Sequence, residues 1–362
     1  MTQIRCQCGS IWEAPTEPDG ELAACTNCGN CLGLAASEGG AILKASLRGH
    51  RQPVRAIGFS PDSRLFAAAY GAPSATVAKS QIGGVTLWDV DLTEPVAALQ
   101  WHRDAVLSLA FSPDEPLMAT GSRDGTIAIW NVGRGLWDAV LGVREHSWRA
   151  GAGPITSLAF SADGKWLASG GEKEPIKLWD CSAWQAAHQI PHDRQGVCRV
   201  AFSPTVEHLA AVWQSRGPAV LWSVPKWEPY LQLRLKTEED RDDFGLAFSP
   251  DGSRLAVLSA NEGRIWDIST CQILTSFLAA KSQAIAWSPT GKLLATCGPE
   301  VAGNASIRLW DADTAVECDQ LAGFRSAVTS IAFSADGKYL ASGCQDATVN
   351  LWAMAAEHVP AK

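Results

Sequence analysis

Five of the eleven cysteines lie within the first 31 residues, and they are the first candidates for chemistry. Cys6 and Cys8 form a C-x-C-G motif, and Cys25 and Cys28 form a C-x-x-C-G motif. The glycine that closes each motif lets the backbone turn tightly, so that amide groups point at the thiolate sulfurs. Four thiolates in two such turns suit a tetrahedral zinc ion with no open coordination position. We therefore expect a structural zinc site with these four cysteines as ligands.

The two motifs resemble the zinc ribbons that precede other domains in many bacterial proteins, over about residues 4–34. The sixteen intervening residues are long enough for a short hairpin that turns at residues 18–20. Cys31 offers a second C-x-x-C motif with Cys28, but it lacks the closing glycine and we place it outside the ligand set. The alternatives are a redox C-x-x-C motif, which no βαβ pattern supports, and a set of free cysteines. A module this short buries little surface, so the metal substitutes for a core.

The overall composition limits the partners and the compartment. The net charge is −8, and residues 1–40 contain one basic residue, Arg5, against five acidic residues. Phosphate binding depends on cations, so we expect no nucleic-acid partner. The sequence has neither a long apolar run for a membrane span nor a basic-then-apolar start. We expect a cytoplasmic protein with reduced cysteines.

Seven tryptophans end short apolar segments at intervals of 42 to 49 residues. Upstream of each, an apolar segment runs into a serine-containing turn such as GFSPD or AWSPT. A period in the forties with several short strands per unit is typical of a propeller blade. The seven residues are Trp88, Trp130, Trp179, Trp222, Trp266, Trp310 and Trp352.

These tryptophans, four of them followed by Asp, and the seven serine turns resemble the WD-repeat β-propeller family over residues 41–354. The resemblance implies an all-β fold with seven four-stranded blades. A sandwich or a helical solenoid would not have this period or so little helical apolar spacing. The expected organisation is a zinc ribbon over residues 1–36, a propeller over 41–354 and a tail over 355–362.

Ring closure is the next expectation. An apolar residue follows six of the tryptophans by eleven positions, and we expect it in the outermost strand of each blade. These residues are Leu99, Leu141, Ile190, Leu233, Phe277 and Leu321. Trp352 has only ten residues after it, so the eleven-residue interval cannot be applied to the seventh blade. Near the start of the sequence, Leu47 precedes His50 by three residues, as Leu99 precedes His102. Residues 41–47 should therefore complete the seventh blade, as ring closure in the family implies, and remove an exposed strand edge.

The family resemblance also implies a hydrogen-bonded tetrad within a blade. The second blade matches it with His102, Thr120, Asp124 and Trp130, whereas Phe324 takes the histidine position in the seventh blade. Most blades must then depend on apolar packing. We assign His102 and Asp124 a buried structural role rather than a catalytic one.

Variation in spacing predicts where the connections are longest. We take the interval of eleven residues from each tryptophan to its outer-strand residue as constant. The extra residues of the longer repeats then fall between the second and third strands of a blade and between successive blades. Both connections lie on one face, because the strands alternate in direction. The predicted long connections are 71–84, 142–153, 236–243 and 297–306.

The connection 142–153 combines aromatic area with hydrogen-bond donors at Arg144, His146, Trp148 and Arg149. Tryptophan and arginine dominate the energetics of protein interfaces, so these residues are candidates for partner binding. The alternative is that Trp148 packs against the neighbouring blade and needs no partner.

No catalytic constellation is visible. The sequence lacks a G-x-S-x-G motif and a phosphate-cradling loop. The six later cysteines are scattered and are expected to be small core residues. The favoured function is a noncatalytic, monomeric scaffold for protein partners, whose identity the sequence does not give. The alternative is a ligand-binding or enzymatic propeller, which would need ionisable side chains converging at the central channel.

Overall fold

A computed structural model describes most of residues 41–355 and, before residue 41, only the backbone of four short strands. Residues 197 and 198 are described by backbone alone. The described ranges of the main body are 41–48, 52–72, 83–133, 142–172, 174–191, 196–205, 207–213, 218–224, 226–233, 245–259, 262–279, 282–298 and 305–355.

The described secondary structure consists of strands, with no helix in these ranges. None of the described residues therefore forms a helix long and apolar enough to cross a membrane. The strands before residue 41 are β1 (Thr2–Arg5), β2 (Ile11–Ala14), β3 (Ala23–Ala24) and β4 (Cys31–Leu32). The remaining strands are β5 (Ile42–Leu47), β6 (Val54–Phe59), β7 (Leu65–Tyr70), β8 (Gly84–Asp89), β9 (Pro95–Leu99), β10 (Val106–Phe111), β11 (Leu117–Ser122), β12 (Thr126–Asn131), β13 (Val143–Arg149), β14 (Ile155–Phe160), β15 (Trp166–Gly171), β16 (Ile176–Asp180), β17 (Gln185–Ile190), β18 (Val197–Phe202), β19 (His208–Trp213), β20 (Ala219–Ser223), β21 (Glu228–Leu233), β22 (Leu246–Phe248), β23 (Arg254–Leu258), β24 (Glu262–Asp267), β25 (Gln272–Leu278), β26 (Ala284–Trp287), β27 (Leu293–Cys297), β28 (Ala305–Asp311), β29 (Glu317–Phe324), β30 (Val328–Phe333), β31 (Tyr339–Cys344) and β32 (Val349–Ala353).

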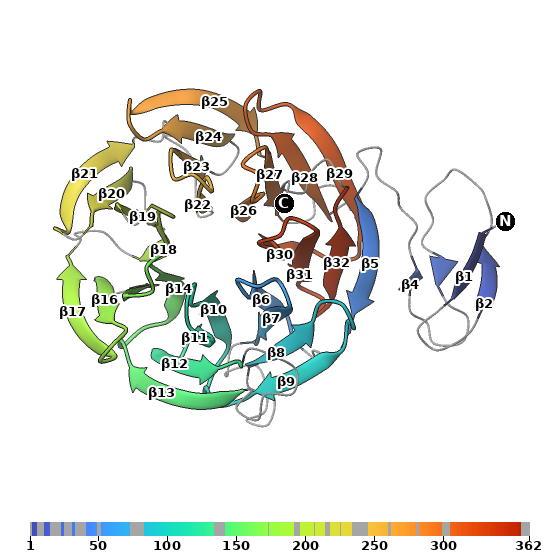
Figure 1. The fold of residues 1–362 in the computed structure, drawn as a ribbon, viewed down its shortest axis with the longest axis horizontal. Coiled ribbons are helices and arrows are strands. Elements are labelled where there is room, and N and C mark those ends of the chain that lie inside the picture. Colours follow the sequence, from blue (N-terminus) through green and yellow to red (C-terminus); the bar gives the residue numbers. More distant parts are fainter. Residues whose placement is uncertain are drawn as a thin grey trace.

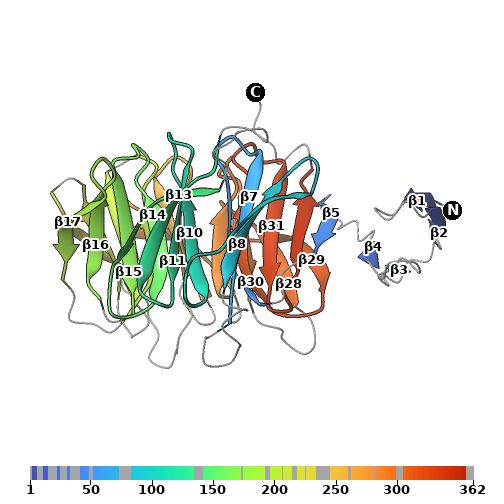
Figure 2. The ribbon, with the colours of Figure 1, turned by 90° about the horizontal axis from the view of Figure 1, so that it is seen from below.

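Seven four-stranded antiparallel sheets are arranged as the blades of a ring (Figure 1). Blade one is β6–β9, and blades two to six follow in order as β10–β13, β14–β17, β18–β21, β22–β25 and β26–β29. Blade seven is β30, β31, β32 and β5. The predicted all-β, seven-bladed propeller is confirmed. Figure 2 shows the inner strands crossing the thickness of the ring and the connections gathered at its two faces.

Each sheet is apolar on both sides because it is packed between two others. In β7, Ala67, Ala68 and Ala69 are fully buried, and such small residues let neighbouring sheets approach near the ring axis. Gly343 of blade seven shows the limit of this approach, since a Cβ atom there would lie 2.4 Å from Cγ1 of Val54 in blade one. Adjacent blades therefore share their apolar clusters.

The outer strands lie where the tryptophan spacing predicts them in five blades. Leu99, Ile190, Leu233, Phe277 and Leu321 are buried in β9, β17, β21, β25 and β29. Each residue lies opposite the third strand of its sheet, as in the pair Val85 and Leu99. The eleven-residue interval therefore identifies the inward-facing position of the outer strand in these blades.

Blade two departs from this interval, and the prediction for Leu141 and for the connection 142–153 is wrong. Leu141 lies outside the described residues, and Val143–Arg149 forms the outer strand β13 instead of a connection. Trp148 lies opposite Ile127, the register that Leu99 has in blade one. The extra residues thus belong to the connection between β12 and β13, on the opposite face from the predicted one.

Strand β5 lies at the outer edge of blade seven and pairs antiparallel with β32. Leu47 lies opposite Val349, in the register predicted from Leu99. The ammonium group of Lys44 donates a hydrogen bond of 2.9 Å to the carbonyl oxygen of Val90 in blade one, and it lies 4.5 Å from the centroid of the Tyr339 ring. β5 therefore contacts both blades at this junction. His50 lies outside the described residues.

The four strands before residue 41 form two separate antiparallel pairs, β1 with β2 and β3 with β4. The expected hairpin around residues 18–20 would pair β2 with β3, and the described pairing differs from it. Each strand pair instead brackets one cysteine motif, with residues 6–10 between β1 and β2 and residues 25–30 between β3 and β4. Cys6, Cys8, Cys25 and Cys28 themselves lie outside the described residues.

We predict that removal of residues 1–47 destabilises the ring far more than removal of residues 1–34. Only the longer truncation removes β5, exposing the edge of β32 and the apolar surface buried by Leu47. The expected cost is on the order of 5 kcal/mol. Thermal denaturation of the two truncated chains measures the difference. Equal melting temperatures would contradict a stabilising role for β5.

Candidate functional site

The predicted tetrad residues of blade two meet in one hydrogen-bonded group. Nε2 of His102 lies 2.7 Å from the hydroxyl of Thr120, which also accepts a 2.9 Å hydrogen bond from the indole of Trp130. Nδ1 of His102 lies 2.8 Å from the hydroxyl of Thr126, and that hydroxyl donates to Asp124. The nearest direct approach of Asp124 to His102 is 3.9 Å. Thr126, which the sequence pattern did not single out, therefore connects the carboxylate to the imidazole.

Burial lowers the pKa of His102 to about 4, and Arg144 adds to this effect, whereas the carboxylate of Asp124 opposes it. The ring is thus neutral near pH 7. Both of its nitrogens are occupied by threonine hydroxyls, so the imidazole has no free position for acid–base chemistry. The group holds β10, β11 and β12 together rather than acting on a substrate.

Other blades keep only part of this arrangement. The indoles of Trp179 and Trp310 donate to Ser169 and Thr296, each at 2.9 Å. In blade five, Val257 occupies the position that Thr120 has in blade two, and the buried indole nitrogen of Trp266 has no hydrogen-bond partner among the described residues. This agrees with the expectation that most blades depend on apolar packing.

The four partner-binding candidates of the sequence lie along β13, but they do not form one patch. A bulge at Glu145 changes the side of the strand on which the following residues lie. The guanidinium of Arg144 covers the ring of Trp101, with 4.5 Å between the guanidinium carbon and the ring centroid. His146 lies on the other side of the sheet, 5.7 Å from the ring of Trp184 in blade three.

Trp148 fills the gap between blades two and three. Its ring centroid lies 5.0 Å from that of Trp179 and 6.0 Å from that of Trp184. It belongs to the apolar cluster of Ile127, Ile155 and Trp179, so it is a packing residue. Arg149 is exposed at the end of the strand, and its role in partner binding remains a prediction.

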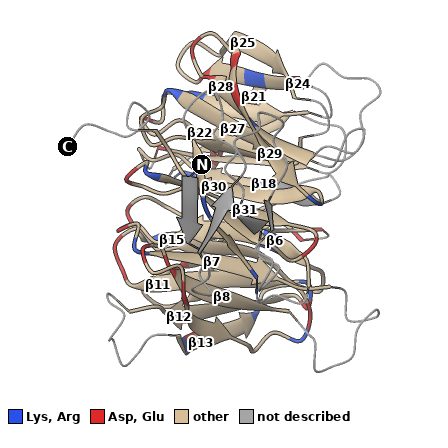
Figure 3. Cartoon of the chain, turned by 90° about the vertical axis from the view of Figure 1, so that its right-hand side faces the viewer, with Lys and Arg blue, Asp and Glu red and all other residues tan. Residues whose placement is uncertain are grey.

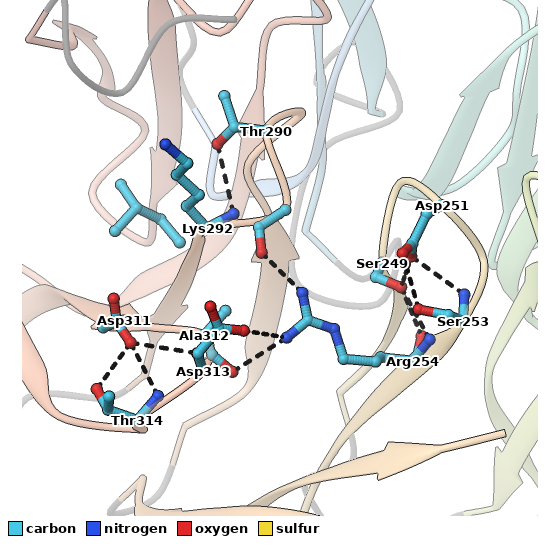
Figure 4. Close-up of polar contacts among 12 residues, drawn as sticks. Ser249, Asp251, Ser253, Arg254, Thr290, Lys292, Asp311, Ala312, Asp313 and Thr314 are labelled. Carbon is cyan, nitrogen blue, oxygen red and sulfur yellow. Dashed lines mark hydrogen bonds and ion pairs between the residues drawn. The ribbon is translucent and has the colours of Figure 1, made fainter. Parts of the chain in front are cut away.

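Polar contacts on the face formed by first-to-second and third-to-fourth strand connections join neighbouring blades (Figure 4). Arg254, the first residue of β23, reaches from blade five to blade six. Its guanidinium donates to Asp313 at 2.7 Å and to the carbonyl oxygen of Gly291 at 3.1 Å, and it lies 4.9 Å from the centroid of the Trp287 ring. The hydroxyl of Ser249 accepts the amide of Arg254 at 2.9 Å and fixes the start of the strand. Sequence spacing did not reveal this contact, because its partners lie one repeat later.

The described cysteines are not a reactive set. Burial raises the pKa values of Cys181 and Cys344 to about 12 and also raises the pKa of Cys297. Cys271 and Cys318 are exposed, so the expectation that the later cysteines are core residues is wrong for these two. Within the described ranges, no three His, Cys, Asp or Glu side chains gather as metal ligands. The predicted zinc ligands lie outside those ranges.

We predict that Trp148→Ala destabilises the protein by about 3 kcal/mol, because it leaves a cavity between blades two and three. Arg149→Ala, the matched control on the same strand, should change the stability by less than about 0.5 kcal/mol. Thermal or denaturant unfolding of the two variants measures this difference. Equal effects would contradict the assignment of Trp148 to the core.

We predict that His102 makes stability depend on pH between about 6.5 and 4. An imidazole whose pKa is lowered by folding binds fewer protons in the native state, so its contribution is complete above pH 6.5. That contribution falls as the pH falls toward 4, by about 3 kcal/mol in total. Unfolding curves at several pH values should show this slope, and His102→Gln should remove it. The same slope in the variant would assign the dependence to other groups.

The fold can be compared with known proteins at this point. The model of the family described as "WD domain, G-beta repeat" matches residues 42–72, 93–131, 142–180, 274–311 and 317–353, which is just over half of the chain. All five matched stretches lie in the ring.

Three relatives share part of the sequence. Periodic tryptophan protein 2 of Saccharomyces cerevisiae is 22% identical over 84% of this chain and 39% of its own length. Pre-mRNA-processing factor 19 homolog 2 of Arabidopsis thaliana is 24% identical over 75% of this chain and 51% of its own. The target of rapamycin complex subunit wat1 of Schizosaccharomyces pombe is 34% identical over 31% of this chain and 36% of its own. The matches span about half or less of each relative. The family match and the ring of seven four-stranded sheets together show that this chain belongs to the WD40 family.

Proposed function

We propose that the protein is a noncatalytic, monomeric scaffold that binds other proteins in the cytoplasm. The observation that carries this proposal is that three of the four longest connections between strands of the ring begin and end on one face. They join β7 to β8, β21 to β22 and β27 to β28, whereas the fourth joins β12 to β13 on the opposite face. Variable connections on a rigid frame are well suited to recognition.

The state of the ionisable side chains also supports binding rather than catalysis. The pKa of Cys344 is raised by burial to about 12, which keeps its thiol protonated and a poor nucleophile. The pKa of His102 is lowered to about 4, and its nitrogens face hydroxyl groups of the same blade. Both groups are therefore buried and held within their own blades, which favours a structural role for them.

One relative supports a role in assemblies through its name, since wat1 is called a subunit of a complex. The likeness to that relative covers 31% of this chain, so we carry over only the class of role. Protein partners, rather than nucleic acid, also agree with the net charge of −8.

Quantitative affinity purification of the full chain, with mass spectrometry, tests this function. We expect charge reversal of the exposed Arg103 and Arg123, on the face with the long connections, to reduce partner recovery about tenfold without changing the melting temperature. Lys226→Glu and Lys292→Glu, at exposed positions on the opposite face, are the matched controls. Equal recovery with both pairs of variants, or turnover of a substrate by the purified protein, would contradict the proposal.

We further propose that residues 1–36 form a zinc-stabilised module with Cys6, Cys8, Cys25 and Cys28 as ligands. The chemistry of the donor set supports this proposal, because four thiolates suit a closed tetrahedral zinc site. The two strand pairs before residue 41 add support, because each places its cysteine motif in the connection between two paired strands. Zinc would supply folding energy there and no catalysis.

We predict about one zinc ion per purified chain, lost when Cys6 and Cys28 are replaced by serine. Metal analysis measures the content, and proteolysis of the N-terminal module measures its folding. Cys31→Ser, outside the proposed ligand set, is the control and should retain the metal. A metal-free module that resists proteolysis equally would contradict the site.

A further inference from the structure

The junctions between blades are equivalent on the face that carries the turns between first and second strands. At three junctions, the first residue of the second strand contacts the next blade through a large side chain. Trp166 fills this position between blades three and four, where its ring lies 5.6 Å from that of Trp227. Arg254 fills it between blades five and six, and Tyr339, together with Lys44, fills it between blades seven and one. A large side chain therefore covers each of these junctions.

The same position is a leucine in blades one, two and six; Leu293 of blade six is buried in an apolar cluster with blade seven, whereas the junctions of blades one and two each hold a cavity. Leu65 lines a cavity of about 220 Å³ between blades one and two. Leu117 lines a cavity of about 480 Å³ between blades two and three. The two cavities are neighbours, because the turn from Ser112 to Leu117 contributes to the walls of both.

The cavities have apolar walls with room for side chains of another molecule. Pro61, Phe111 and Val132 line the cavity between blades one and two. Phe160, Trp166 and Trp184 line the cavity between blades two and three. Covering the solvent-accessible part of such aromatic and apolar walls with an apolar side chain is favourable.

Acidic side chains outnumber basic ones in the lining of the two cavities. Six carboxylates line the two cavities, against the two cations Arg64 and Lys165. Lys165 is already paired with Asp163, at 3.1 Å. Hydrogen bonds from the hydroxyl and amide of Ser182 lower the pKa of Asp180, so this carboxylate is ionised near pH 7. Figure 3 shows these acidic turns in red beside β7, β11 and β15. The six carboxylates are Asp62, Asp89, Asp114, Glu115, Asp163 and Asp180.

We propose that the two cavities form one docking groove for an extended segment of a partner protein that carries apolar side chains among lysines and arginines. Each cavity accepts an apolar side chain, and the carboxylates of the rim attract the flanking cations. Charge complementarity selects this occupant over an acidic or a neutral segment. The groove lies on the opposite face from the connections β7–β8, β21–β22 and β27–β28, so the scaffold would hold a second partner there.

Selection from random dodecapeptides displayed on phage tests this groove with the full chain as bait. We expect enriched peptides to combine Lys or Arg with Leu, Ile or Phe, and their binding to weaken as salt is added. Enrichment of acidic peptides, or of none, would overturn the proposal. This outcome is independent of partner recovery in affinity purification, which tests the other face.

Two variants test whether the selected peptide binds in the groove. Leu117→Trp copies the residue that fills the junction of blade three, and Glu115→Lys reverses a carboxylate shared by both cavities. Each should weaken binding of the fluorescein-labelled peptide about tenfold in an anisotropy titration. Glu207→Lys, an exposed carboxylate in the corresponding turn of blade four, is the matched control and should bind as the unaltered chain does. Equal affinity of all three variants would place the peptide elsewhere and overturn the proposal.

The proposal would also be overturned if the groove were occupied by another segment of this chain or by a second copy of the chain. Residues 134–141, which follow Gly133 at the wall of the smaller cavity, include Trp137 and lie outside the described ranges. If Trp137→Ala strengthens peptide binding about tenfold, that segment is the native occupant. If light scattering finds a dimer that Leu117→Trp dissociates, the occupant is a second copy of the chain.

Discussion

The structure depends on the burial of both sides of every sheet. Each blade is apolar toward both of its neighbours, so no blade is stable alone and the burial is complete only when the ring is continuous. The cluster that joins blades seven and one shows this requirement, since it unites Leu47 and Val54, near the start of the ring, with Leu351, near its end. Close approach near the axis, as at Gly343 and Val54, leaves little room for alternative packing.

Packing also explains why polar groups within the blades vary so widely. Blade two has the full group of His102, Thr120, Asp124 and Trp130, whereas blade five has Val257 at the position of Thr120. A ring held by shared apolar surface tolerates this loss, because a typical hydrogen bond contributes only about 1 kcal/mol net. The hydrogen-bonded group fixes local register in the blade that has it, and shared surface holds the others.

The sequence predicted the ring well because one repeat fixes most of its geometry. Tryptophan spacing located seven blades and five of the outer-strand positions. Residues 41–47 were assigned to blade seven from the family resemblance and the position of Leu47 before His50, and Leu47 lies opposite Val349. The prediction from tryptophan spacing failed at Trp148. The number of residues from Trp130 to the first turn of blade three is the same whether the extra residues lie between β12 and β13 or between β13 and β14. Spacing measures the length of a repeat and not the place of an insertion within it.

Features that depend on neighbouring blades were also missed. Arg254 and Leu117 occupy the same position in the repeat, yet one closes a junction and the other leaves a cavity. What each side chain contacts lies in the next blade, so a pattern within one repeat does not reveal it. The two strand pairs around the cysteine motifs were missed for a different reason, since very short strands have little periodicity to detect.

The pairing of β5 with β32 has a consequence for synthesis of the chain. β5 leaves the ribosome before the other strands of the ring, and β32 leaves it last, about 300 residues later. Throughout translation, the nascent chain therefore carries a strand whose partner does not yet exist, together with an incomplete stack of apolar sheets. Such intermediates expose unpaired strand edges that are prone to aggregation. Chaperone occupancy on the nascent chain should therefore be highest just before the seventh blade emerges. A circularly permuted gene that begins at β6 and ends with β5 would turn this longest-range pairing into a local hairpin.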